Sequence, residues 1–268
     1  MSARINIRDF DECRNIHKGA VFIVASGGSA KDFHPEQFAD VPMITMNGAI
    51  SKFIGTGVKP FFYACTDKNF PEQQPELFSQ AMLLSERVAL WEDQVQSLSV
   101  APKGEVFLLS KAPKLSWGEL IGVDKDLIRN RNFLKRRNRR IGFSKNLKRG
   151  FFDARTVAYV ALQIAYHAGF NKVVMVGVDL NQAVSRFYEE KNTVVSPCGL
   201  DQHFHTRILP SFKIVARKVI SDQFHVYNLS NSSRIPADII PQIHLDDLDA
   251  HVYDLDCSKK ENACKSLD

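Results

Sequence analysis

The chain has 268 residues, of which 44% are hydrophobic and 24% charged, with 14 glycines and 11 prolines. This composition is typical of a globular protein and excludes a collagen-like or disordered chain. The apolar runs are strand-sized, far shorter than the roughly 20 residues of a membrane span, and no signal-like apolar stretch follows the first residues. The five cysteines lack metal-type spacing and do not predict a disulfide framework. We therefore expect a cytoplasmic protein that does not span a membrane.

The net charge of +5 conceals one strongly basic segment. From Arg129 to Arg149 the chain has ten Lys and Arg and no acid, so the remainder carries 5 − 10 = −5. Such a segment could bind nucleic acid, lipid headgroups or a phosphorylated glycan, or form an exposed helix face. Only Phe133 and Phe143 lie within it, fewer rings than base stacking uses. Phosphate or carboxylate recognition is favoured, and no nucleic acid is expected.

Short apolar runs predict strands at residues 19–24, 42–46, 60–64, 81–84, 105–109, 172–178 and 224–229. Helical spacing predicts helices at 152–167 and 211–221, with Gly169 ending the first. The alternation predicts an α/β fold, a single Rossmann-like domain with a mostly parallel sheet flanked by helices. We place this domain at residues 1–240. Residues 111–150 would form a basic excursion or partial helix, residues 182–203 a lid loop and residues 241–268 a loosely held tail.

In an open parallel sheet, ligands bind beyond the carboxyl ends of the strands. Small residues there let backbone N–H groups approach a phosphate, and Asn or Asp can contact sugar or base. Ligand-free turns would explain each position almost as well, and the dinucleotide glycine fingerprint and the P-loop ending are absent, which disfavours an NAD-dependent oxidoreductase. Together the residues after four predicted strands indicate a nucleotide pocket: Ser26, Gly27, Gly28 and Ser29, then Asn47 and Gly48, Thr66 and Asp67, and Asp179 and Asn181.

Two histidines, His203 and His205, precede the helix predicted at 211–221. A neutral imidazole at this edge could accept a proton from a sugar hydroxyl, although the pair could instead ligate a metal or be structural. No third ligand of suitable spacing is evident, so no metal is expected. The acid pairs Asp247/Asp249 and Asp254/Asp256 lie in the predicted tail and are expected to be solvated.

Four segments, residues 24–33, 46–51, 155–170 and 176–181, together resemble a known family. They are similar to the bacterial lipopolysaccharide-core transferases of Kdo thought to add a third Kdo residue, over about residues 5–240. More distantly, the chain resembles bacterial sialyltransferases that use CMP-sialic acid and have one Rossmann-type domain with a small lid. The resemblance implies a glycosyltransferase that moves Kdo from CMP-Kdo to the Kdo region of the lipopolysaccharide inner core. Inversion is expected, with no metal and no cofactor beyond the donor substrate.

The resemblance also implies residue roles. His205 lies within one residue of the family's general base and is preferred to His203. Tyr188, Thr156 or Arg155 could stabilise the departing phosphate. The expected donor-binding residues are Ser26, Gly27, Gly28, Ser29, Asn47, Asp67, Arg155, Thr156, Asp179, Asn181 and Tyr188, and the expected acceptor-binding residues are Arg136, Arg137, Arg139 and Arg140.

The expected partners are a CMP-sugar donor, the lipopolysaccharide inner-core acceptor and an anionic membrane surface. A peripheral position on the inner membrane would suit the basic segment, at about 1 kcal/mol per nearby cation. One alternative is an enzyme of the same fold that uses another CMP-activated acid sugar, such as sialic acid. Another is a non-catalytic protein that binds RNA or anionic lipid, which predicts salt-sensitive binding that does not depend on Asn47 or Asp179.

Overall fold

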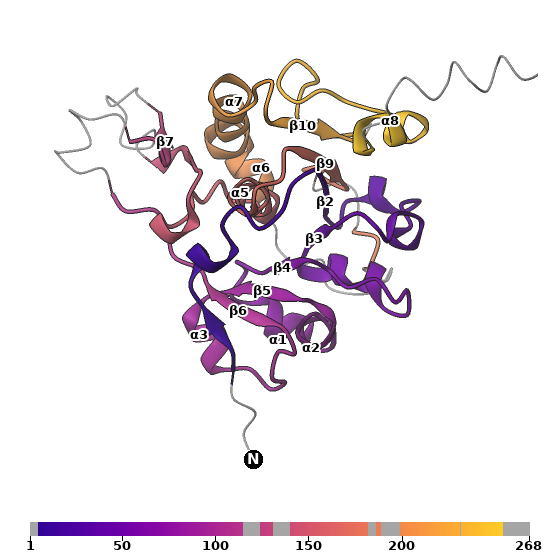
Figure 1. Ribbon diagram of the computed structural model, residues 1–268, viewed down its shortest axis with the longest axis vertical. Coiled ribbons are helices and arrows are strands. Elements are labelled where there is room, and N and C mark those ends of the chain that lie inside the picture. The colour runs from indigo at the N-terminus through magenta and orange to yellow at the C-terminus, as the bar shows by residue number, and fades with distance from the viewer. Residues whose placement is uncertain are drawn as a thin grey trace, which may run out of the picture.

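The computed structural model describes residues 5–114, 124–130, 140–181, 186–188, 199–230 and 232–253. Within them, eight strands form one sheet in the order β1-β6-β5-β4-β3-β2-β9-β10 (Figure 1). Every neighbouring pair in this sheet is parallel, which confirms the predicted fold class. The strands are β1 (Ile7–Arg8), β2 (Ala20–Val24), β3 (Met43–Met46), β4 (Phe62–Ala64), β5 (Arg87–Leu90), β6 (Glu105–Leu108), β9 (Lys172–Val176) and β10 (His225–Asn228).

The strand order changes direction at β2. After β2 the chain builds β3, β4, β5 and β6 on one side, and it later adds β9 and β10 on the other. Val24, the last residue of β2, is in register with Thr45 on one side and with Val176 on the other. The turns that follow these three strands therefore lie side by side. This is the position at which such sheets bind ligands.

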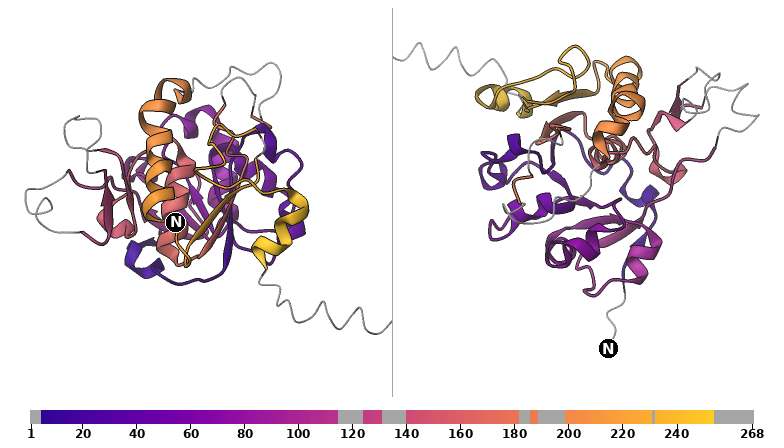
Figure 2. Two further views of the ribbon diagram at one scale, coloured as in Figure 1. Left: turned by 90° about the horizontal axis from the view of Figure 1, so that it is seen from above. Right: turned by 180° about the vertical axis from the view of Figure 1, so that it is seen from behind.

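Helices cover both faces of the sheet (Figure 2). Side chains alternate along β2, so that Val21 and Ile23 pack in one core cluster while Phe22 and Val24 pack in the other. The first cluster includes residues of α5 (Val157–Ala168) and α7 (Leu209–Lys218), and the second those of α2 (Pro75–Leu84) and α8 (Leu248–Val252). The other helical elements are η1 (Phe10–Cys13), η2 (Gly28–Ala30), η3 (Pro35–Phe38), η4 (Asn47–Phe53), α1 (Phe70–Gln73), α3 (Glu92–Gln96), η6 (Leu147–Arg149), α6 (Leu200–His203), η7 (Phe204–Ile208) and η8 (Leu245–Asp247).

Helix α5 occupies the centre of the first core cluster. Ten of its twelve residues are buried, because it lies between the sheet and its neighbouring elements. Its Tyr159 hydroxyl donates to the carbonyls of Gly142 (2.8 Å) and Ser211 (3.2 Å). Gly169 ends the helix as predicted, in the left-handed conformation (φ 98°) that glycine adopts readily. No helix among the described residues has the length and hydropathy of a membrane span.

The strand predicted at residues 81–84 is wrong. These residues end α2, and the next strand, β5, begins at Arg87. A run of four apolar residues fits either element, but Pro75 stands at the first position of a helix, where proline is favoured. Ala81 and Met82 lie three and four residues after Phe78, so all three side chains pack on the same face of the helix, in one core cluster.

The basic excursion contains sheet, contrary to the expectation of a partial helix. Strands β7 (Leu127–Arg129) and β8 (Gly142–Ser144) form an antiparallel pair in which Ile128 is opposite Phe143. Leu127 and Phe143 are buried in the first core cluster, which holds the pair against the domain.

The segment from Leu245 begins as helix, not as a loose tail. Leu248 and Val252 of α8 are buried, and the Tyr253 hydroxyl donates to Asp40 (2.9 Å). Asp247 and Asp249 are exposed, as expected. Asp254 and Asp256 lie outside the described residues.

His167 joins α5 to two other elements. It is 1% exposed, its Nε2 lies 2.7 Å from the carbonyl of Phe10, and its Nδ1 accepts the amide of Leu147 at 3.2 Å. Burial lowers the pKa of His167 below its ordinary value of 6.5, although the Phe10 carbonyl opposes this. The imidazole is therefore held neutral.

We expect His167 to make the fold sensitive to mild acid. Below pH 6.5, His167 binds a proton more readily in the unfolded chain than in the folded protein. The free energy of unfolding should therefore fall by up to about 1.4 kcal/mol per pH unit, until the folded pKa is reached. His167→Gln keeps a donor and an acceptor and should reduce this fall in urea titrations between pH 7 and 5. His34→Gln, which changes an exposed imidazole, should keep it. A His167→Gln protein with the wild-type pH dependence would contradict the assignment.

Candidate functional site

Asp179 connects three turns by hydrogen bonds at the edge of the sheet where the strands end, which we call the carboxyl edge. Its carboxylate accepts the backbone N–H of Ser29 (3.0 Å) and the hydroxyls of Ser29 and Ser230, which follow β2 and β10. Asp179 itself follows β9 and is 2% exposed. Two predicted donor-site residues, Ser29 and Asp179, are thus hydrogen-bonded to each other. Asp179 holds the turns that would surround a ligand.

The glycines after β2 allow the neighbouring turns to approach closely. The Gly27 amide donates to the Gly177 carbonyl at 3.0 Å. A Cβ atom at Gly27 would lie 2.4 Å from that oxygen and 2.6 Å from Asp179 Oδ2. Any larger residue would therefore separate the β2 and β9 turns.

Asn47 follows β3 with a strained backbone and an unsatisfied side chain. Its φ is 43°, and its Oδ1 atom is buried without a hydrogen-bond partner among the described residues. Of four described non-glycine residues with positive φ, three are at this edge: Asn47, Arg155 and Leu180. Such strain is often found at binding sites. A buried acceptor without a partner costs about 1–3 kcal/mol, which a ligand donor would recover.

Residues 186–188, which belong to the predicted lid, lie across the turns after β2 and β3. The Phe187 amide donates to the Ser26 carbonyl (3.3 Å). The Tyr188 ring lies against Gly48, where a Cβ atom would be 2.2 Å from Tyr188 Cε1. Arg186 donates to the Tyr188 hydroxyl at 2.9 Å. The fold therefore brings residues 187–188 against the two turns that contain Ser26 and Asn47. Sequence reasoning missed Arg186, because an isolated arginine in a polar loop carries no signal.

Asp153 organises the start of α5. Its carboxylate accepts the Arg155 amide (2.8 Å) and pairs with Lys111 Nζ (3.3 Å), and its backbone carbonyl accepts a hydrogen bond from Arg207. Burial alone would raise the pKa of Asp153, but the hydrogen bond from the Arg155 amide and the charges of Lys111 and Arg155 lower it below its ordinary value. Thr156 is the N-cap residue, and its side chain makes no capping hydrogen bond. Two predicted donor residues, Arg155 and Thr156, thus stand at the positive end of a long helix.

The two histidines lie on α6 and the π-helical turn η7, a type of turn often found at functional sites. Arg234 fixes this segment: it donates to the Leu180 carbonyl (3.3 Å), pairs with Asp201 and lies 4.0 Å from the Phe204 ring centre. His205 is exposed and His203 partly buried. Residues four apart share one side of a helical turn, so His203 lies on the side of Arg207, a residue that sequence reasoning missed.

The remaining predicted residues are less informative. Asp67 follows β4. Its carboxylate accepts a hydrogen bond from the Asn69 amide (3.0 Å), which stabilises the turn. Asn181 lies after β9 and is partly exposed. Arg140 is exposed, and Arg136, Arg137 and Arg139 lie outside the described residues.

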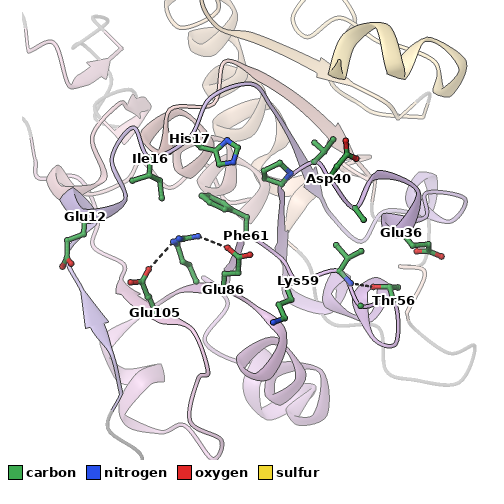
Figure 3. A pocket seen from close by; sticks show the side chains of 16 residues that line it. Glu12, Ile16, His17, Glu36, Asp40, Thr56, Lys59, Phe61, Glu86 and Glu105 are labelled. Carbon is green, nitrogen blue, oxygen red and sulfur yellow. Dashed lines mark hydrogen bonds and ion pairs between the residues drawn. The ribbon is translucent and has the colours of Figure 1, made fainter. Parts of the chain in front are cut away.

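A hollow of about 940 Å³ lies at the opposite edge, where the strands begin (Figure 3). Its lining includes Glu36 and Asp40, and Arg87 pairs there with Glu86 (3.1 Å) and Glu105 (3.3 Å). This excess of carboxylates does not suit an anionic sugar nucleotide. The hollow is therefore distinct from the predicted site.

Comparison with known proteins gives one family match. Residues 6–246 match the model of a family described as 3-deoxy-D-manno-octulosonic acid transferase WaaZ. A probable 3-deoxy-manno-octulosonic acid transferase of Salmonella typhimurium is 30% identical over 79% of this chain and 81% of its own length. Its counterpart from Escherichia coli is 27% identical over 86% and 84%.

Two solved structures show weaker likenesses. The MAf glycosyltransferase of Magnetospirillum magneticum has a TM-score of 0.49 and 15% identity over 86% of this chain and 34% of its own. The sialyltransferase CstII of Campylobacter jejuni, solved with cytidine-5'-monophosphate, has a TM-score of 0.43 and 12% identity over 84% of each chain.

Removing the Asp179 carboxylate should destabilise the fold. Asp179→Ala leaves the Ser230 hydroxyl, which is fully buried, and both donors of Ser29 without their acceptor. Because Ser29 is exposed and can bond to water, we expect a loss of about 2 kcal/mol in the free energy of unfolding. Asp249→Ala, which removes an exposed carboxylate, should change it by less than about 0.5 kcal/mol. Equal urea midpoints for the two variants would show that Asp179 does not hold the turns.

Proposed function

The chain belongs to the family of 3-deoxy-D-manno-octulosonic acid (Kdo) transferases, and from this premise we propose that it moves Kdo from CMP-Kdo to the Kdo region of the lipopolysaccharide inner core. The observation that carries the donor assignment is the contact of Phe187 with Ser26 and of Tyr188 with Gly48, next to Asn47 in the chain, at the point where the strand order reverses. In this place the free Asn47 oxygen would accept a hydrogen bond from the nucleotide, and the small-residue turn would approach its phosphate.

The first half of the proposed reaction breaks the bond between the anomeric carbon of Kdo and the phosphate oxygen. The electron pair leaves with CMP, and the sugar becomes oxocarbenium-like. Tyr188, whose hydroxyl already accepts a hydrogen bond from Arg186, would donate to the departing phosphate. Arg155 and Thr156 would add a cation and a hydroxyl at the start of α5. We propose that these groups stabilise the charge without a metal ion.

In the second half, the acceptor hydroxyl attacks the anomeric carbon from the face opposite CMP and its proton passes to an imidazole, which gives inversion. The resemblance favours His205 as this base, whereas the helical spacing favours His203, on the side of Arg207. The acceptor carries carboxylates and phosphates. Arg140, together with Arg136, Arg137 and Arg139, would bind these groups or the anionic membrane surface on which a peripheral enzyme works.

Asn47 provides the test of the donor site. Asn47→Gly removes the side chain while tolerating the positive φ, and it should weaken CMP binding about tenfold in isothermal titration. Asn15→Gly makes the same change at an exposed residue with φ 53°, before β2. This control should bind CMP as the wild type does. If both variants kept the wild-type affinity, Asn47 would not belong to the donor site.

The two histidines provide the test of the chemistry. Purified protein incubated with CMP-Kdo and Kdo-containing lipid A should release CMP, and CMP-sialic acid should replace the donor poorly. Substituting the general base by Ala should lower the rate at least about 100-fold while leaving CMP affinity unchanged. We expect this loss in only one of the two variants, His205→Ala and His203→Ala. Full activity in both would exclude an imidazole base, and no CMP release by the wild type would contradict the proposed reaction.

A further inference from the structure

Arg207 has a partly buried guanidinium with unused hydrogen-bonding capacity. One nitrogen donates to the Asp153 carbonyl, which fixes the direction of the side chain. Its Nε atom is buried and has no hydrogen-bond partner among the described residues. A guanidinium always carries its charge and five N–H donors, so a buried donor without an acceptor is costly unless a ligand supplies one.

The surroundings of Arg207 contain an excess of positive charge. Burial lowers the pKa of Arg207, Asp153 opposes this effect, and Arg155 and Arg140 lower the pKa further. Lys111 joins the group through its ion pair with Asp153 (3.3 Å). Four cations (Arg140, Arg155, Arg207 and Lys111) and one carboxylate give 4 − 1 = +3. An anion bound there would relieve the mutual repulsion of the cations.

The group continues along the carboxyl edge through the residues that follow β6, β5 and β4. Lys111 lies 5.6 Å from the centre of the Trp91 ring, and Lys68 lies 5.9 Å from it. Trp91 follows β5, is partly exposed and is fixed by a hydrogen bond from its Nε1 to the Thr66 carbonyl (3.0 Å). Lys68 pairs with Asp93, whereas Lys111 belongs to the cation group. A fixed aromatic ring beside that group suits a sugar ring that carries an acidic group, because it offers a flat apolar surface next to the charge.

We propose that Arg207, supported by Arg140 and Lys111, binds the carboxylate of the acceptor's acid sugar, with the sugar chain extending toward Trp91. This inference rests on the proposed function. The donor also carries a 2-keto acid carboxylate, so the ligand chemistry alone fits both substrates. The acceptor is favoured because Arg207 belongs to the same helical segment, α6 and η7, as the histidine that would take the acceptor's proton.

Binding to a carboxylated sugar and to its neutral ester tests the proposal without turnover. The probes are the methyl α-glycoside of Kdo and its methyl ester, titrated by saturation-transfer NMR. The wild type should bind the acid at least about tenfold more tightly than the ester, as expected for a charge-assisted pair. Arg207→Gln should reduce this preference to less than about twofold. Arg217→Gln, which removes an exposed cation from α7, should retain it.

CMP binding and a second variant separate the possible outcomes. Arg207→Lys keeps the charge but loses the forked geometry. It should retain part of the preference, and its thermal unfolding should match that of the wild type. If Arg207→Gln retains the full preference, the proposal is overturned. The acceptor assignment is also overturned if Arg207→Gln weakens CMP-Kdo binding as much as glycoside binding. The two proposals can fail separately. If the wild type releases no CMP but Arg207→Gln still abolishes the preference for the acid, the proposed reaction is refuted and this subsite stands.

Discussion

The hydrogen bonds to the Asp179 carboxylate are the constraint on which the site depends. One buried side chain holds the turns after β2, β9 and β10, so that the small-residue turn lies at the reversal of the strand order. Gly27 and Gly177 have no side chains to separate these turns. With the β2 turn fixed in this way, residues 186–188 can reach from Ser26 to Gly48, the residue after Asn47, and place the Tyr188 ring against it.

The two edges of the sheet have opposite electrostatic character. At the carboxyl edge, Arg207, Arg155 and Lys111 surround one carboxylate at the start of α5, which favours anionic ligands. At the amino edge, the 940 Å³ hollow has five carboxylates in its lining against two basic residues, Lys59 and Arg87 (Figure 3). For a substrate pair in which both sugars are acids, charge is therefore a better guide to the site than cavity volume.

The parallel sheet and the convergence of its turns at the carboxyl edge could be predicted because buried strands and their turns are local features of the sequence. The contact between Ser29 and Asp179 could not be foreseen, since it depends on how three turns pack. The strand predicted at 81–84 failed because short apolar runs do not distinguish helix from strand. Arg186 and Arg207 were missed for a related reason: a single arginine gains meaning only from partners distant in the sequence, here Tyr188 and Asp153.

The central claim is that CMP binds at the carboxyl edge between the turns after β2 and β3. A crystal structure of the protein soaked with CMP tests it most directly. The account predicts the nucleotide within hydrogen-bonding distance of Asn47 and Tyr188, with its phosphate directed toward the start of α5. CMP bound in the acidic hollow, or at the carboxyl edge without contact to either residue, would contradict it.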